Sequence, residues 1–330
     1  MRRFKAFKAL LLTVSLATLS ATAFGQAANS ARPGTLNYVE GQASVEGRPV
    51  TPNSVGNAEL QAGQYISTAN GKAELLLTPG VFLRLGNDST VQMISPNLTK
   101  TEVRVERGHV DVEADQLYKQ NVILIDMEKG QTHLLQNGLY TFDADSSTVR
   151  VFDGKAAIYP GADLIANVKP IDVKGGHQIA LTGEPVKPQS FNKDKSEDDL
   201  YRWSSLRSEY LGEANIDLAE DYAGYSGFNP GWYWAGGPYG YTWLPGDGLF
   251  WNPFGYGFYS PYYLYGGGFI YGRYGRGGYP YRGGFGYRGG AVAGNFRGGG
   301  AVGGGFHGGG GGFQGGGGGF HGGGGGGGHR

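Results

Sequence analysis

The sequence contains no cysteine, which excludes disulfide bonds and any chemistry or metal binding by thiols. Leu, Ile and Val are scarce between Tyr222 and Tyr287, so an aliphatic core is not expected there. No apolar run is long enough to span the roughly 30 Å core of a bilayer. The longest run near the N-terminus, residues 9–19, would span only about 16 Å as a helix.

The first 27 residues have the three parts of a secretory signal peptide. Four basic residues and no acidic one precede the uncharged run, and small residues then offer cleavage sites ending at Ala23 and Ala27. A buried first helix is the alternative, but the run shows no helical spacing of polar residues. We therefore expect export to the periplasm or the cell surface, with no membrane span left after leader removal.

Charge is distributed unevenly along a chain whose formal net charge is zero. The leader carries four positive charges, and the chain from Ala223 onward carries six arginines against Asp247 alone. The residues between them therefore hold a net charge of −9. This division predicts an acidic globular part joined to a mildly basic tail.

Residues 35–190 are expected to form a mainly β domain. Valine and leucine alternate with charged residues at 81–85, 102–106 and 110–113, which predicts strands with one face in a core and the other in water. Turn residues interrupt these runs about every 8–12 residues. The fold class predicted is an antiparallel β-sandwich or roll of many short strands, with one amphipathic helix and a disordered glycine-rich tail after it.

A short pattern recurs three times, with Gly41, Gly108 and Gly154 each standing between two apolar strand segments. Glycine at such a place predicts a positive-φ turn or bulge. The copies are irregularly spaced, so they indicate a reused hairpin corner and no solenoid repeat.

Residues 196–222 change to helical spacing. Ser196 and Asp199 resemble a capping box, and an apolar stripe follows at spacings of three and four. The stripe consists of Leu200, Trp203, Leu206, Tyr210, Leu211 and Ala214. We expect this stripe to pack on the β domain; a contact with a partner or a second copy is the alternative.

Two kinds of biased sequence follow the predicted helix. Residues 223–265 form an aromatic, proline- and glycine-rich segment, in which Trp243 and Trp251 either stack locally or dock on the β domain. Residues 266–330 are mostly glycine with isolated Tyr, Phe, Arg and His. Ordering glycine costs the most backbone entropy, so the tail is not expected to form a core, and its last part is predicted to be disordered.

The stretch from Gly63 to about Ile158 resembles the FecR domain family in the order and spacing of its motifs. The matching residues are Gly63, Ile66, Thr68, Gly71, Ala73 and Leu75; Val81, Leu83, Arg84, Leu85 and Ser89; Val103, Val105, Gly108, Val110 and Val112; Gly138, Tyr140 and Phe142; and Val149, Val151, Gly154 and Ala156. Leu139 stands where the family often has threonine.

The resemblance implies a periplasmic β domain of the kind that relays the state of an outer-membrane iron–siderophore receptor to a cytoplasmic sigma factor. Such regulators carry a cytoplasmic segment and a membrane span before this domain, and the sequence shows neither. We therefore expect the module without the anti-sigma activity. The layout is also similar to secreted bacterial FecR-domain proteins, with Tyr201, Trp203, Arg207, Ser208 and the Trp232–Tyr263 stretch as matching positions.

No motif predicts catalysis or a cofactor. His109, His133 and His177 are expected at the surface, and no nucleophile elbow, zinc-protease motif or phosphate-binding loop occurs. Asp143 and Asp145 fit a turn better than a calcium loop. The tail histidines at 307, 321 and 329 fit a solvated chain better than a metal site. We therefore expect a non-enzymatic protein with no cofactor and no bound metal.

The expected interaction residues are aromatic or basic: Trp203, Trp232, Trp234, Trp243, Trp251, Arg282 and Arg288. The Arg-Gly-Gly repeats resemble RNA-binding segments, but six arginines are too sparse, and the leader directs the tail away from cellular RNA. Two functions stay open. One is a module that binds an envelope protein or polysaccharide; the other is a structural or adhesive surface protein that self-associates through its tail.

Overall fold

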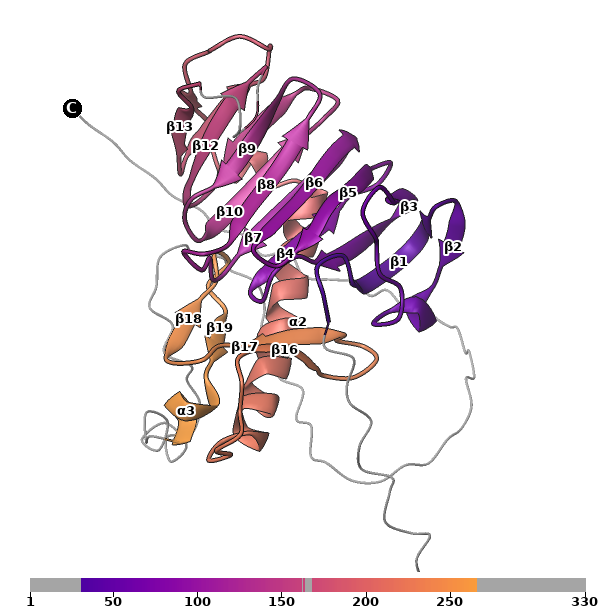
Figure 1. Ribbon diagram of the computed structural model, residues 1–330, viewed down its shortest axis with the longest axis vertical. Helices are drawn as coiled ribbons and strands as arrows, with labels where there is room; N and C mark the ends of the chain where they lie inside the picture. The colour runs from indigo at the N-terminus through magenta and orange to yellow at the C-terminus, as the bar shows by residue number, and fades with distance from the viewer. Residues whose placement is uncertain (1–30, 162, 164–167, 266–330) are drawn as a thin grey trace, which may run out of the picture. The chain divides into compact units, whose positions relative to one another are not determined.

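The computed structural model describes residues 31–161, 163 and 168–265 (Figure 1). These residues belong to one compact unit. The predicted signal peptide, the predicted disordered tail 266–330, Arg282, Arg288 and the tail histidines lie outside the described residues.

The fold is mainly β, as predicted, and most of the strands join in one 15-stranded sheet. Its strands are β1 (Leu36–Val45), β2 (Arg48–Val50), β3 (Tyr65–Leu76), β4 (Val81–Leu85), β5 (Thr90–Asn97), β6 (Lys100–Arg107), β7 (His109–Ala114), β8 (Val122–Met127), β9 (Gly130–Leu134), β10 (Gly138–Asp143), β11 (Thr148–Val151), β12 (Lys155–Pro160), β13 (Ile171–Lys174), β14 (His177–Ala180) and β15 (Gln189–Ser190). Two short 3-10 helices are η1 (Pro52–Ser54) and η2 (Asp194–Ser196).

The hydrogen-bonded path runs β13-β12-β9-β8-β6-β5-β3-β4-β7-β10-β11-β14-β15, with β1 and β2 attached beside β3. All pairings are antiparallel except β6 with β8. Strands β13 and β14 stand near opposite ends of this path, yet they are consecutive in sequence and in contact. The sheet therefore folds back on itself around one aliphatic core.

The core is built by the alternating residues that the sequence indicated. Val81, Leu83 and Leu85 of β4 and Val110 and Val112 of β7 are all fully buried in it. The side chains on the opposite face of these two strands are buried as well, which corrects the expectation that this face lies in water. A helix and the aromatic segment cover that face instead.

Helix α2 (Asp199–Asp221) lies against β4 and β7, and confirms the predicted helix after the strands. Asp198 caps it by accepting a hydrogen bond from the Tyr201 backbone N–H at 2.9 Å, so the cap is not the predicted Ser196. The predicted apolar stripe is also partly wrong, because Leu206 and Tyr210 are exposed. The packed face of the helix is largely polar and small, with Ser204, Arg207, Ser208, Gly212 and Asn215 buried beside Leu200, Leu211, Ala214 and Ala219.

The aromatic segment forms two hairpins and one helical turn. Its elements are β16 (Gly231–Trp234) paired with β17 (Tyr241–Leu244), β18 (Leu249–Trp251) paired with β19 (Gly257–Tyr259), and α3 (Pro261–Tyr263). Trp243 is fully buried with Leu76, Phe82, Leu211 and Phe258. No aliphatic core was expected in residues 223–265, and the core there is aromatic, because aromatic rings supply the apolar area that aliphatic residues lack. Of the two alternatives for Trp243, it docks on the β domain through Leu76 and Phe82.

The recurrent glycine pattern has the predicted backbone conformation. Gly41, Gly108 and Gly154 have φ values of 66°, 78° and 93°, a region that favours glycine. Gly41 stands at a register shift between β1 and β3, and Gly108 joins β6 to β7. These two positions redirect the chain, as a bulge and as a tight connection.

Candidate functional site

A row of charged side chains crosses the face of the sheet that α2 covers. Glu74 of β3 stands opposite Arg84 of β4, and Arg84 stands opposite Asp111 of β7. Glu113 follows two residues later on the same face of β7. All four are fully buried, and the Arg84 guanidinium donates to Glu74 at 2.7 Å and to Glu113. The row is therefore a buried ionic ladder across three adjacent strands.

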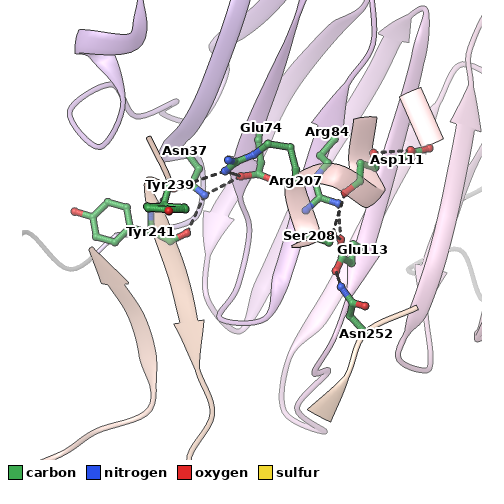
Figure 2. A network of polar contacts seen from close by, with 11 residues as sticks. Asn37, Glu74, Arg84, Asp111, Glu113, Arg207, Ser208, Tyr239, Tyr241 and Asn252 are labelled. Atoms are coloured by element: carbon green, nitrogen blue, oxygen red, sulfur yellow. Dashed lines mark hydrogen bonds and ion pairs between the residues drawn. The ribbon is translucent and has the colours of Figure 1, made fainter. Parts of the chain in front are cut away.

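Helix α2 presents one polar side chain to each carboxylate of this row (Figure 2). Ser204 donates to Asp111 at 2.8 Å, and Ser208 donates to Glu113. Arg207 donates to Glu74 at 2.9 Å, and its guanidinium lies 4.1 Å from the Tyr38 ring centroid. The spacings of three and four residues place all three on one helix face, directed at the sheet.

The aromatic segment closes the same network from the other side. Asn252 donates to Glu113 at 2.8 Å, and the Tyr239 carbonyl accepts from Arg207 at 2.9 Å. Asn37 of β1 donates to Glu74 at 2.8 Å and exchanges hydrogen bonds with the Tyr241 backbone. We call this connected set the polar clasp; it comprises Asn37, Glu74, Arg84, Asp111, Glu113, Ser204, Arg207, Ser208, Tyr239, Tyr241 and Asn252.

The arginines set the charge state of the clasp. Burial alone would raise the pKa of Glu74, but the charges and hydrogen bonds of Arg207 and Arg84 outweigh it and lower this pKa to about 2. Burial opposes the charge on Arg84, yet Glu113 and Glu74 raise the pKa of its guanidinium. Glu74 and Arg84 are therefore both ionised at neutral pH, and each is paired with opposite charge.

For two neighbouring carboxyl groups, nearby positive charge offsets the effect of burial on the pKa less completely. Burial raises the pKa of Asp111 to about 6, against the lowering effects of His109 and Ser204. Burial and the charge of Glu113 raise the pKa of Asp115 well above its usual value. The three carboxylates of the clasp thus outnumber its two arginines, and Asp111 takes up a proton at higher pH than an ordinary aspartate.

His109 links this region to the start of α2. Its ring lies 3.0 Å from the Asp198 carboxylate and 3.9 Å from that of Asp111. Burial lowers the pKa of His109, but the hydrogen bond to Asp198 and the charges of Asp111 and Asp198 outweigh it and raise the pKa. The ring is only 25% exposed, so the expectation of a surface histidine is wrong because the capping aspartate covers it.

The clasp fastens three parts of the chain together and offers no opening to a substrate. Its carboxylates and guanidinium groups pair with one another and are shielded from solvent, so the arrangement suits a structural role. Within the described residues, Arg84 Nη2, Asp111 Oδ1 and Arg207 Nε have no hydrogen-bond partner. Among the described residues, no group of three histidine, aspartate or glutamate side chains is placed to hold a metal ion. No helix in the described part of the chain is long and apolar enough to cross a membrane.

An open groove of about 660 Å³ lies on the surface beside the clasp. Its walls come from the chain before β1, the turn between β3 and β4, the β5–β6 hairpin and the start of β16. The lining residues are Ala31, Arg32, Pro33, Pro79, Pro96, Asn97, Leu98, Asn229, Pro230, Gly231, Trp232 and Tyr233. The groove therefore combines rigid prolines and aromatic rings with two side-chain amides and one guanidinium.

Trp232 connects this groove to the sheet. Its ring packs edge-on against Phe82 of β4, with centroids 5.0 Å apart, and is 9% exposed. Its indole N–H has no acceptor among the residues that the structure describes. Trp232 pairs in register with the buried Trp243, and the clasp holds β17 through Asn37. The clasp therefore positions one wall of the groove.

The five tryptophans singled out from the sequence occupy different environments. Trp243 is a core residue, and Trp232 is largely buried at the groove. Trp203 is half-buried beside Tyr38, at a centroid distance of 6.1 Å. Trp234 and Trp251 are exposed, by 40% and 53%. The structure thus brings Trp232, Trp234 and Trp243 together on one hairpin and leaves two of the five rings open to solvent.

Sequence reasoning did not identify Glu74, Glu113 or Asn252 as members of a buried network. Arg207 and Ser208 were noted through the family resemblance, without a partner. The available signal was the pair of acidic residues at alternate positions of β7, next to an arginine at the same phase of β4. Such a pattern is equally typical of a solvated strand face, so it does not reveal a covering helix.

No family model and no curated protein matches the sequence. Two crystal structures of a "putative anti-sigma factor" from Parabacteroides distasonis ATCC 8503 are similar in structure, with TM-scores of 0.32. They are 12% and 11% identical to this chain, cover 47% and 48% of it, and are themselves covered over 72% and 74% of their length. Similarity at this level assigns no residue roles and no activity.

Proposed function

We propose that this protein is an exported, non-enzymatic β-domain module of the FecR type that binds a polysaccharide of the cell envelope in the groove beside β16. The groove is the observation that supports the proposal. Sugar rings pack on aromatic faces, and their hydroxyl groups exchange hydrogen bonds with amide and guanidinium groups. Tyr233, Asn97, Asn229 and Arg32 supply these groups around the groove.

The proposal gives the polar clasp a supporting role. A binding wall made from a short aromatic hairpin needs to be held rigidly, because disorder there would cost affinity. Asn37, Arg207 and Asn252 fasten the hairpins to the sheet with buried hydrogen bonds. The clasp therefore acts as the preorganising element, and the groove as the surface that meets the ligand.

Export is part of the proposal and is supported by the leader pattern. Arg32 and Pro33 line the groove only a few residues after the expected cleavage site at Ala27. Cleavage there leaves only residues 28–30 before Ala31. N-terminal sequencing of the protein from an envelope fraction should begin near residue 28; an intact Met1 on cytoplasmic protein would contradict export.

A second candidate function, adhesion or assembly, is favoured by the exposed aromatic rings outside the groove. Trp251, Tyr225 and Tyr265 are each more than half exposed, on the last segment that the structure describes. Contiguous exposed apolar patches mark interaction surfaces, and Tyr265 lies against Gly224, the residue before Tyr225. Self-association through the tail would use this surface, and binding of an envelope ligand would not require it.

Leu98 provides the direct test of the groove. It lines the groove and is 49% exposed, so Leu98→Glu should leave the fold intact and place a charge in the binding site. With the full chain, purified envelope polysaccharide is titrated while tryptophan fluorescence is followed. We expect at least about a tenfold loss of affinity, the effect of roughly 1.4 kcal/mol.

Leu135→Glu is the matched control, since Leu135 is 39% exposed and outside the groove. It should bind like the unmodified chain. Equal binding by both variants would rule out the groove as the site. If the chain binds an envelope protein and no polysaccharide, the ligand of the groove is a protein and the proposed ligand class is wrong. If replacing Trp251 and Tyr225 with alanine abolishes self-association of the chain and leaves polysaccharide binding unchanged, the adhesive function is favoured.

A further inference from the structure

The second half of α2 has an acidic surface that lacks basic partners. Glu209, Glu213, Asp217, Glu220 and Asp221 are exposed, and no basic residue occupies the last turn. None of the ion pairs formed within the described part of the chain involves any of the five. The C-terminal end of a helix also carries about half a negative charge. A cationic group would therefore be stabilised here.

Repulsion among these acidic groups affects Glu213. Burial, followed by the charges of Glu209 and Asp217, raises the pKa of Glu213. Glu209 accepts a hydrogen bond from the Tyr256 hydroxyl at 3.3 Å, which brings no positive charge. The surface is thus negative along one side of the helix and becomes more so towards Asp221.

An aromatic surface continues from the same end of the helix. Tyr222 packs edge-on against Tyr233 at 4.9 Å, and Phe228 packs against Tyr262 at 5.5 Å. Tyr225 contacts Tyr222 at 6.2 Å and is 58% exposed. Tyr225 and Tyr262, the latter 46% exposed, are the open rings of this group, whereas Phe228 is buried and Tyr222 and Tyr233 are partly buried. We call the acidic residues and these rings together the helix-end surface.

The chain itself continues directly from this surface. Tyr265, the last described residue, is 71% exposed and lies against Gly224. Residues 266–277 then read Gly-Gly-Gly-Phe-Ile-Tyr-Gly-Arg-Tyr-Gly-Arg-Gly, with two arginines and no acidic residue. Arg273 is eight residues beyond Tyr265, a maximum reach of about 27 Å. The five residues from Asp217 to Asp221 span only about 6 Å of helix, so they lie well within that reach.

We propose that the helix-end surface is a docking site for residues 266–277 of the same chain, with Arg273 and Arg276 on the acidic residues and Tyr271 and Tyr274 on the exposed rings. Charge complementarity and tethering both favour this occupant. Arginine pairs with carboxylates and stacks on aromatic faces. A tether this short gives an effective concentration in the millimolar range, above that of a second copy in dilute solution. Docking would cover part of the aromatic surface that a partner could otherwise use.

Proteolysis of the full chain tests the proposal, because an arginine-specific protease cleaves a docked site only when it opens. If residues 266–277 are docked for about four-fifths of the time, cleavage after Arg273 and Arg276 slows about fivefold. Arg288 and Arg297 serve as reference sites in the same molecule, and a free peptide of residues 266–300 gives the intrinsic rate at each site. Mass spectrometry of the fragments over time provides the four rates.

The charged contacts are tested by neutralising Asp217→Asn, Glu220→Gln and Asp221→Asn together, which should remove most of the protection. The matched control neutralises three exposed acids of the β domain, Glu40, Glu106 and Glu128, and should keep it. In the unmodified chain, about 1 M salt, which shortens the Debye length to roughly 3 Å, should also remove protection.

Equal normalised rates at all four sites would overturn the proposal, as would protection that survives both high salt and the triple substitution. Protection that grows with protein concentration would assign the surface to a second copy and overturn docking within one chain. The groove is not part of this surface, so polysaccharide binding and protease protection can fail independently.

Discussion

Replacing Arg84 with methionine tests whether the polar clasp holds the molecule together. Arg84 is fully buried between Glu74 and Glu113, so Arg84→Met leaves both carboxylates in the interior without their shared counter-charge. Removing one partner of a buried ion pair costs about 3–5 kcal/mol. The cost is not doubled, since Glu74 keeps Arg207 and Glu113 keeps Asn252. We therefore expect a loss of about 3–5 kcal/mol, a large share of a typical 5–15 kcal/mol total.

Urea denaturation of the full chain, followed by tryptophan fluorescence, measures this loss. The buried Trp243 packs on the same face of the sheet and reports on its covering. Lys155→Met is the control, because Lys155 pairs with Asp172 at 2.7 Å while the two side chains are 28% and 53% exposed. Such a surface pair contributes less than about 1 kcal/mol.

A second substitution separates charge from packing. In Arg84→Met with Glu113→Gln, one unpaired charge is gone, and we expect about 1–3 kcal/mol of the loss to return. A loss below about 1 kcal/mol for Arg84→Met would refute the reasoning, because the carboxylates would then be solvated in the folded protein. A double variant no more stable than the single one would show that the cost lies in packing and not in charge.

Three further predictions concern single positions. The pKa of Asp111 in the folded protein, about 6, exceeds its usual 3.8, so the contribution of Asp111 to stability falls as the pH rises from about 4 to 6. This fall amounts to roughly 2–3 kcal/mol, and Asp111→Asn should remove it from the pH dependence of the unfolding free energy, measured by denaturation at several pH values. An unchanged pH dependence would contradict the prediction. Asp198→Ala removes the cap of α2 and should cost about 1–2 kcal/mol and lower the pKa of His109 in an NMR titration, whereas an unshifted imidazole would disprove the pairing. Gly108→Ala places a Cβ 2.4 Å from the Ser89 hydroxyl, while Gly47→Ala meets nothing within 4 Å at a similar φ; the first should cost about 2 kcal/mol more in thermal denaturation, and equal costs would show that the connection relaxes.

The sequence by itself determined the local structure of the β domain and its aliphatic core. Val81, Leu83 and Leu85 point into that core because strand residues alternate between two faces, whatever lies on the other side. Gly108 takes a positive φ because the steric restriction acts within its own residue. The helix after the strands was also predictable from its spacing, although its cap was assigned two residues too early.

Only the tertiary structure decided which polar residues are buried and which aromatic residues are not. The far face of β4 and β7 has the same alternation whether water or α2 covers it, so burial of Arg84 and Glu113 could not be inferred. Leu206 and Tyr210 are exposed because the sheet offers α2 carboxylates, and serines and an arginine match them better than apolar groups. Trp243 and Trp251 stand on two short hairpins of like composition, yet Trp243 packs with Leu76, Phe82 and Phe258 and is buried, whereas Trp251 is 53% exposed. Alternation of apolar and polar residues along a strand shows which face each side chain occupies. Whether a charged side chain is buried depends instead on partners far away in sequence, which only the folded chain brings together.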